Sequence, residues 1–118
     1  MTTNLRLTQI ATTGAIVALL VCSAAYASQF IGTGRVLPFA TDRWDVWTSP
    51  GHSQIVVDGD GDTDLDCYVY DRAGRLLGGD DDGTDYCVVS FRRPASGNVV
   101  LDIENRGRVY NAYSIIAE

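Results

Sequence analysis

The stretch Asn98-Val99-Val100-Leu101-Asp102-Ile103-Glu104 decides the fold class of this chain. Val99, Leu101 and Ile103 alternate with Asn98, Val100, Asp102 and Glu104, and this period of two is the side-chain period of a β-strand. The alternation predicts a half-buried strand, with the three apolar residues facing a core and an acidic outer face in water.

Similar short runs recur on both sides of this stretch, between clusters of Gly, Asp and Asn, and no segment after residue 27 keeps a helical period over three turns. We therefore predict an all-β fold, an antiparallel sandwich of about eight strands. The expected strands are residues 35–40, 43–49, 54–58, 66–71, 75–77, 87–91, 98–104 and 112–117.

The cysteines share the phase of the core residues. Cys67 alternates with Val69 on one side of its strand, and Cys87 alternates with Val89 and Phe91 on the same kind of inward row. A pair of inward cysteines in a small exported domain is more often a disulfide than a metal site or a catalytic thiol. We predict a buried Cys67–Cys87 bridge.

The amino-terminal segment reads as a signal for export. Arg6 precedes an apolar run over residues 16–22, and Ala25-Tyr26-Ala27 places small residues at the positions that a signal peptidase reads. A membrane anchor is the alternative, but no basic stop-transfer cluster follows the apolar run. We expect a helical signal peptide over residues 1–27 and one domain over 28–118, in the periplasm or outside the cell.

The charge balance excludes some partners. The 118 residues carry 9 Lys plus Arg against 15 Asp plus Glu, a net charge of −6. Nucleic acid and anionic membranes are bound by basic faces, so neither is an expected partner of the exported domain.

Two acidic bunches suggest a cation. They are Asp58, Asp60, Asp62, Asp64 and Asp66, and then Asp80, Asp81, Asp82 and Asp85. Crowded carboxylates repel one another unless they are solvated or neutralised, and oxygen ligands are those that Ca²⁺ prefers. An EF-hand is excluded, because Val69 stands where its bidentate Glu belongs. The alternative is two solvated turns.

The sequence offers little for catalysis. His52 is the only histidine, it follows Pro50-Gly51 in an expected turn, and no nucleophile-elbow spacing is present. One histidine and two bridged cysteines are also too few for a typical catalytic zinc site. We expect no enzyme activity.

Aromatic residues are the best candidates for ligand binding. Trp44 shares its phase with Val46 and is expected in the core, whereas Tyr68 and Tyr70 oppose Cys67 on the outer face of their strand. Cross-strand aromatic pairing is one interpretation. The other is a binding platform for a polymer or peptide, since tyrosine has a rigid apolar body and a polar tip.

Two longer stretches, with neighbouring segments, resemble a known family. They are Gly61-Asp62-Thr63-Asp64-Leu65-Asp66-Cys67-Tyr68-Val69-Tyr70-Asp71 and Pro94-Ala95-Ser96-Gly97-Asn98-Val99-Val100-Leu101-Asp102-Ile103-Glu104-Asn105. Together with the aromatic segment at residues 41–47 and the last strand, they resemble the bacterial pre-peptidase C-terminal domain over residues 34–117. The resemblance implies a jelly-roll-like sandwich, similar to collagen-binding domains, that accompanies secreted peptidases and other exported enzymes.

The resemblance also implies candidate ligands. Related collagenase domains bind calcium and a protein polymer, and by motif position the metal ligands here would be Asp42, Asp64 and Asp66. We therefore expect an exported, non-catalytic accessory or binding domain, with a protein or polysaccharide polymer as ligand and Ca²⁺ as a stabilising ion. The alternative is a free-standing regulatory or targeting subunit of a separate secreted peptidase.

Overall fold

The computed structural model describes residues 29–118, and the predicted signal peptide lies outside this range. Residues 29–118 form strands joined by short turns and loops, with no helix in this part of the chain. The strands are β1 (Phe30–Val36), β2 (Thr41–Thr48), β3 (Gly51–Asp58), β4 (Leu65–Tyr70), β5 (Leu76–Asp80), β6 (Tyr86–Arg93), β7 (Gly97–Asn105) and β8 (Asn111–Ala117). No helix in the described range has the length and hydropathy needed to cross a membrane.

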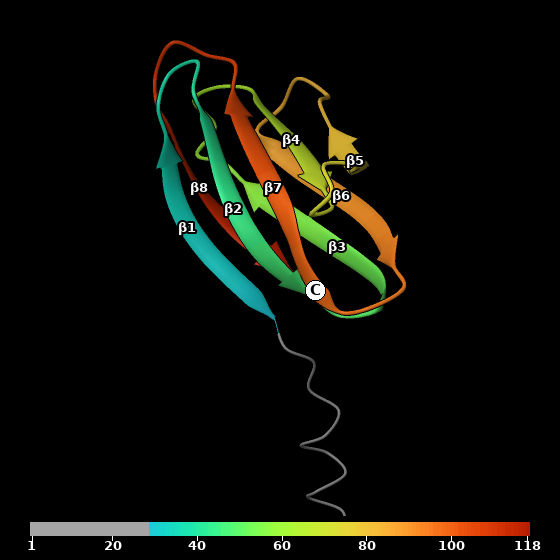
Figure 1. Cartoon of the computed structure of the whole chain (residues 1–118). Coiled ribbons are helices and arrows are strands. Elements are labelled where there is room, and N and C mark those ends of the chain that lie inside the picture. Colours follow the sequence, from blue (N-terminus) through green and yellow to red (C-terminus); the bar gives the residue numbers. More distant parts are fainter. Residues whose placement is uncertain (1–28) are drawn as a thin grey trace, which may run out of the picture.

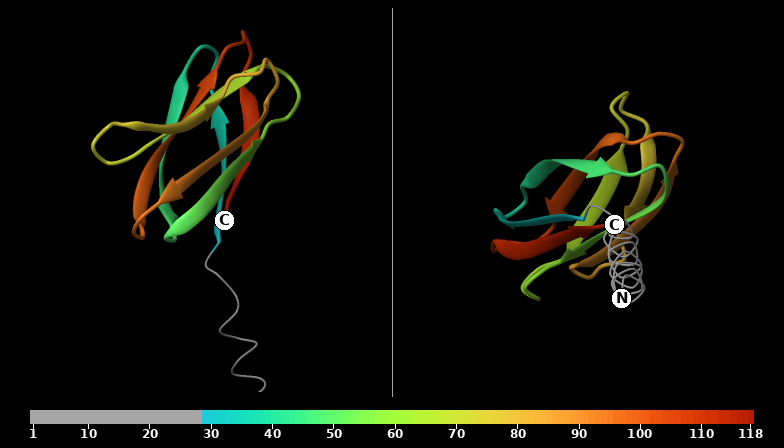
Figure 2. Two further views of the ribbon diagram at one scale, coloured as in Figure 1. Left: turned by 90° about the vertical axis from the view of Figure 1, so that its right-hand side faces the viewer. Right: turned by 90° about the horizontal axis from the view of Figure 1, so that it is seen from below.

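The strands make two four-stranded antiparallel sheets (Figure 1). One sheet has the order β1-β8-β3-β6 and the other the order β2-β7-β4-β5. Successive strands mostly alternate between the sheets, which lie as two layers when the molecule is viewed from below (Figure 2). This strand order is that of a jelly roll, so the predicted fold is confirmed.

The core lies between the layers and follows the predicted alternation. Val99, Leu101 and Ile103 of β7 are completely buried. All three pair with β2, and Leu101 and Ile103 also pair with β4 on the other side. The inward rows predicted for β4 and β6 are also buried. Burial of these β-branched and apolar side chains is the main stabilising contribution to the fold.

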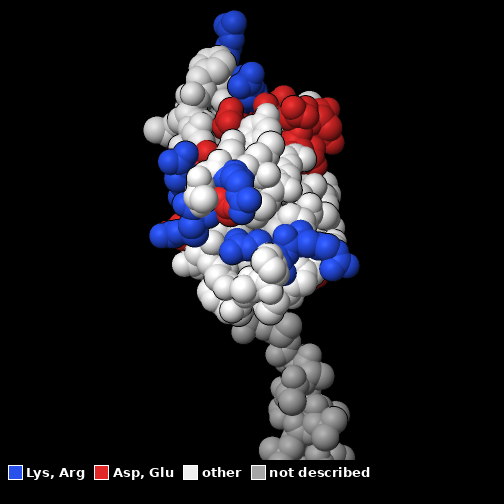
Figure 3. All heavy atoms as spheres, turned by 45° about the vertical axis from the view of Figure 1, so that its right-hand side comes forward, with Lys and Arg blue, Asp and Glu red and all other residues white. Residues whose placement is uncertain are grey.

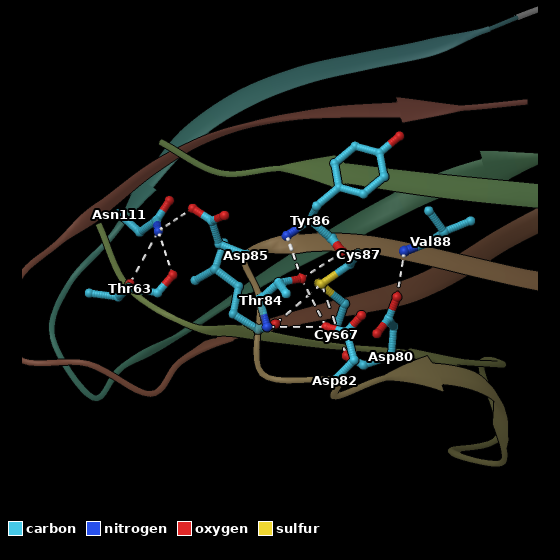
Figure 4. The surroundings of a disulfide bond; sticks show 11 residues. Thr63, Cys67, Asp80, Asp82, Thr84, Asp85, Tyr86, Cys87, Val88 and Asn111 are labelled. Carbon is cyan, nitrogen blue, oxygen red and sulfur yellow. Dashed lines mark hydrogen bonds between the residues drawn. A yellow bond between two sulfur atoms is a disulfide. The ribbon is translucent and has the colours of Figure 1, made fainter. Parts of the chain in front are cut away.

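The predicted disulfide joins the two sheets. Cys67 of β4 and Cys87 of β6 are bonded, with their Cα atoms 6.2 Å apart and both side chains buried. Their surroundings are shown in Figure 4. Because β4 and β6 belong to opposite layers, the bond crosses the core rather than linking neighbouring strands.

The prediction for the first strand was wrong. The strand runs from Phe30 to Val36, and residues 37–40 form the turn that leads to β2. Glycine is usually unfavourable in strands, so the alternation of side chains did not predict a strand over Gly32 and Gly34. Here these glycines leave room for Trp44 and Tyr113, whose rings lie against them in the interior.

Candidate functional site

The outer surface of the β2-β7-β4-β5 sheet carries both candidate tyrosines. The sheet register places Tyr68 beside Asp102 and then Arg43, and places Tyr70 beside Val100. We call this surface, comprising Arg43, Tyr68, Tyr70, Val100 and Asp102, the tyrosine face. Both tyrosines are half-buried there, as the alternation of β4 predicts.

The ring of Tyr68 lies against Gly79, its cross-strand partner on β5. A Cβ atom at Gly79 would lie 2.7 Å from Cδ1 of Tyr68, so only glycine leaves room for the ring in this position. Partial desolvation, together with the negative charge of Asp66, raises the pKa of Tyr68. The phenol therefore stays protonated and can donate a hydrogen bond to a ligand.

Arg43 and Asp102 form a two-pronged ion pair beside the tyrosines. The Arg43 Nε and Nη2 atoms donate to the two carboxylate oxygens of Asp102 over 2.8 Å and 3.0 Å. This hydrogen bonding and the charge of Asp102 raise the pKa of Arg43. The Arg43 side chain is largely exposed while Asp102 is buried beneath it, and the planar geometry orients the guanidinium on the surface.

A shallow depression of about 360 Å³ lies at the Tyr70 end of the tyrosine face, lined by Arg43, Tyr70, Asp71, Arg72 and others. One of its walls is the β4–β5 turn. The Asp71 carboxylate accepts hydrogen bonds from the backbone N–H groups of Ala73 and Arg75, both over 2.9 Å. These bonds lower the pKa of Asp71 and keep the turn in shape. The depression can take a planar or polar group beside an aromatic ring and a guanidinium.

The two acidic loops are built around a buried asparagine. The Asn111 side chain is fully buried, and its Nδ2 donates to the carbonyl oxygen and hydroxyl of Thr63 and to Oδ2 of Asp85 (Figure 4). Asp85 Oδ2 also accepts the N–H of Gly61, and Asp60 accepts the N–H of Ala112 over 2.8 Å. Several carboxylates in these loops therefore act as acceptors for backbone groups.

These loops give the molecule an uneven charge distribution. Acidic side chains gather at one end of the sandwich, where the β3–β4 and β5–β6 loops lie, whereas arginines are spread over the rest of the visible face (Figure 3). A positively charged partner would be steered toward this acidic end, because the electrostatic field of a protein surface guides diffusing molecules before contact.

The structure does not bring together the three residues that the family resemblance implies as metal ligands. Asp42 points into the space between the sheets, where its Oδ2 accepts the hydroxyl of Tyr113 over 2.6 Å. That hydroxyl also accepts the Trp44 indole N–H, and burial with the Asp42 hydrogen bond raises the pKa of Tyr113. Asp66 lies on the other face of the same sheet, since it pairs with Glu104 on the outer row.

Asp64 and Asp66 do lie near each other. Burial, and then the charge of Asp64, raises the pKa of Asp66, while Arg106 approaches the Asp66 carboxylate to 3.4 Å. The Oδ1 atom of Asp64 is buried and accepts no hydrogen bond. Within residues 29–118, no group of three His, Cys, Asp or Glu side chains has the arrangement of a metal site.

His52 lies at the start of β3 rather than in the predicted turn. It is exposed, and its partner across the sheet is Arg92 of β6. The neighbouring inward residue, Ser53, is buried on the other side of the strand. The Ser53 and His52 side chains thus point to opposite faces of the sheet, so these neighbouring residues do not form a nucleophile–base pair.

Sequence reasoning missed the residues that connect these features. Arg43 and Asp102 are distant in the chain, so only the β2–β7 register reveals that they meet beside Tyr68. Asn111 comes just before the predicted strand at residues 112–117, and nothing in the local pattern marks it as a buried hydrogen-bond centre. Asn105 is a similar case, since it is buried and its side chain bridges the carbonyls of Val36 and Val109.

Together these observations define a small disulfide-linked jelly roll with an aromatic, arginine-bearing outer face. No known protein-family model matches the chain, and no curated protein sequence does. The resemblance to the pre-peptidase C-terminal domain therefore stays a prediction.

Solved structures resemble the fold. They include PliG of Aeromonas hydrophila, a periplasmic inhibitor of g-type lysozyme, and the Yersinia pseudotuberculosis-derived mitogen. Each matches with a TM-score of 0.57 and 14% identity, over 78% of this chain and 86% of the other. At this identity the likeness extends to the fold.

Proposed function

We propose that this protein is an exported, non-catalytic binding domain whose tyrosine face contacts a protein or polysaccharide polymer. The observation that carries the proposal is the position of Tyr68 and Tyr70 on a solvent-facing sheet beside the oriented Arg43–Asp102 pair. Tyr and Arg are enriched at binding surfaces, because they combine large contact area with directed hydrogen bonds.

Two features support export. The Cys67–Cys87 disulfide is typical of proteins that mature in an oxidising compartment, and the sequence of residues 1–27 has the features of a cleaved signal peptide. The proposal places the mature domain in the periplasm or outside the cell. Its non-catalytic character is supported by the separation of His52 from Ser53 across the sheet.

Binding is tested on insoluble collagen, chitin and peptidoglycan. The double variant Tyr68→Ala/Tyr70→Ala should lose at least about tenfold in affinity for whichever polymer retains the protein. Tyr110→Ala is the matched control, because Tyr110 is 44% exposed in the loop between β7 and β8, outside the tyrosine face. Equal retention of the double variant and the control would reject the tyrosine face as the binding surface.

The loops at the β1–β2 end favour a second candidate, a regulatory or targeting subunit that docks on a separate secreted peptidase. Leu37, Phe39, Val109 and Tyr110 are large apolar residues between 44% and 70% exposed. Phe39 has a φ of 54°, a conformation that is uncommon for a bulky residue. Exposed apolar groups on such a loop are suited to insertion into a partner.

The two candidates predict different outcomes. A peptidase encoded beside this gene should bind the protein, and Phe39→Ala should weaken that complex while Tyr68→Ala leaves it unchanged. If Tyr68→Ala weakens the complex and Phe39→Ala does not, the docking loops are the wrong surface.

Calcium binding stays a proposal, and it concerns Asp64 and Asp66. The support is the repulsion between their carboxylates and the unpartnered Asp64 Oδ1 atom. If Ca²⁺ binds there, adding it should raise the melting temperature, EDTA should reverse the change, and Asp64→Asn should abolish it. Identical melts with Ca²⁺ and with EDTA would remove calcium from the function.

A further inference from the structure

The outer face of the other sheet, β1-β8-β3-β6, carries an apolar row that crosses all four strands. The register aligns Ile31 of β1 with Ile116 of β8, Ile116 with Val56 of β3, and Val56 with Val88 of β6. Ile31 is 68% exposed and Ile116 is 40% exposed. We call these four residues the isoleucine row. Such a continuous row is unusual on a solvated sheet face.

The residues around the row are polar but mostly uncharged. The register places Thr33, Ser114, Asp58 and Tyr86 on one side of the row, and Gln54 and Ser90 on the other, where the Gln54 amide donates to the Ser90 hydroxyl over 3.3 Å. Burying uncharged polar side chains in an interface costs little free energy, because hydrogen bonds to the partner can replace those to water.

The charges of this face lie toward its two ends and cancel. Arg35 and Asp58 lie toward the loop end, and Arg92 and Glu118 toward the opposite end. The chain beyond Arg6 has 8 Arg against 15 Asp plus Glu, a net charge of −7. The whole of this excess therefore lies outside the β1-β8-β3-β6 face, which two acidic copies can bring together without net charge repulsion.

We propose that this face is a homodimer interface between two copies of the chain, packed sheet on sheet across a twofold axis parallel to the strands. Such an axis places β1 of one copy over β6 of the other, and β8 over β3, so the isoleucine rows cover each other. Arg35 then lies over the partner copy's end that carries Asp58, and Arg92 over the end that carries Glu118. Each end of the interface thus brings together arginine and carboxylate groups from both copies, and the twofold axis repeats each contact.

The opposite outer face is a poorer self-interface. The tyrosine face carries fixed charges at its centre, such as the Arg43–Asp102 pair, and these would have to be desolvated. The dimer would leave that face free for ligands, so this inference is independent of the proposed binding function. It also explains why Ile31 is exposed on an edge strand without Pro, Lys or a bulge.

Sedimentation equilibrium tests the interface on protein expressed from the full chain, from about 1 µM to about 500 µM. We expect a reversible dimer whose Kd rises at least about tenfold in Ile31→Lys. Leu76→Lys is the matched control, because Leu76 is 59% exposed on the other sheet and receives the same charge. It should change Kd less than about twofold. Ile116→Lys is the second variant if Ile31→Lys does not fold.

The register of the dimer has its own test. An equimolar mixture of Ile31→Cys and Val88→Cys should form an intermolecular disulfide under mild oxidation, more than either variant alone, because the twofold axis places these positions opposite each other. A monomer over the whole concentration range overturns the proposal. So does a dimer that Leu76→Lys weakens as much as Ile31→Lys, or a mixture that cross-links no more than the single variants.

Discussion

Replacement of Asn111 by alanine should be among the most damaging single changes in this domain. The Nδ2 atom donates to Thr63 O over 3.2 Å, to Thr63 Oγ1 over 3.1 Å and to Asp85 Oδ2 over 3.0 Å. The Oδ1 atom accepts the N–H of Asp60 over 3.1 Å. Alanine removes all of these hydrogen bonds and leaves the Thr63 carbonyl, the Asp60 N–H and the Asp85 carboxylate without them.

The magnitude follows from the groups that lose their partners. A buried polar group without a hydrogen bond costs about 1–3 kcal/mol. The loops are open enough for water to reach some of the freed groups, so we expect a loss of about 2–4 kcal/mol for Asn111→Ala. In a domain of this size, each kcal/mol shifts the melting temperature by about 4–8 °C, and the variant should melt about 10–25 °C lower.

Thermal and urea unfolding followed by circular dichroism measure the effect. Asp62→Ala is the control, because Asp62 lies in the same loop with an exposed side chain, and its loss should stay within about 0.5 kcal/mol. The reasoning fails if Asn111→Ala melts within about 3 °C of the wild type, or if Asp62→Ala is equally destabilising.

Three further changes probe other parts of the structure. Replacing Cys67 and Cys87 by alanine should cost about 3 kcal/mol from the lost 20-residue loop closure, and a melt unchanged by the double variant would contradict a structural role for the bond. Asp66→Asn should stabilise the domain at about pH 7, because burial raises the pKa of Asp66 and disfavours its charged form, and the gain in stability should shrink as the pH falls and the carboxylate is protonated. Melting temperatures of both proteins over this pH range measure the difference, and a gain that stays constant with pH would contradict the reasoning. Gly34→Ala should cost about 1–3 kcal/mol in urea unfolding, since its Cβ would collide with the hydroxyl of Tyr113, and a neutral result would show that this ring moves freely.

Much of the fold could be predicted because the alternation of residues along a strand shows which side chains face the core. The alternation around Leu101 placed the core side correctly, and the inward phase of Cys67 and Cys87 predicted their bond. In a half-buried strand a shift of one residue would expose the core side, so the apolar pattern and the burial must agree. The first strand escaped because Gly32 and Gly34 contribute no side chains to such a pattern.

The candidate site was harder to predict because it depends on strand pairing. Asp42 and Asp66 both lie in the sheet β2-β7-β4-β5, and a family motif groups them, yet their side chains are on opposite faces. The faces follow from the register across β7, which links residues far apart in sequence. Arg43 meets Asp102 through the same register, so neither the pair nor the separation could be read from either strand alone.

The acidic middle of the chain also follows from the fold. A jelly roll carries the chain from one layer to the other through loops whose backbone N–H groups cannot pair with a strand, and buried donors need acceptors. Asp60, Asp82 and Asp85 accept such loop N–H groups, from Asp62, Thr84 and Gly61 respectively. Asp80 accepts the N–H of Val88 at the edge of β6. Loop construction therefore accounts for these carboxylates without a cation. Asp64 and Asp66, at the start of β4, are a separate case, because the Asp64 Oδ1 atom is buried without a hydrogen-bond partner and the charge of Asp64 adds to burial in raising the pKa of Asp66. A calcium titration should therefore be directed at these two carboxylates.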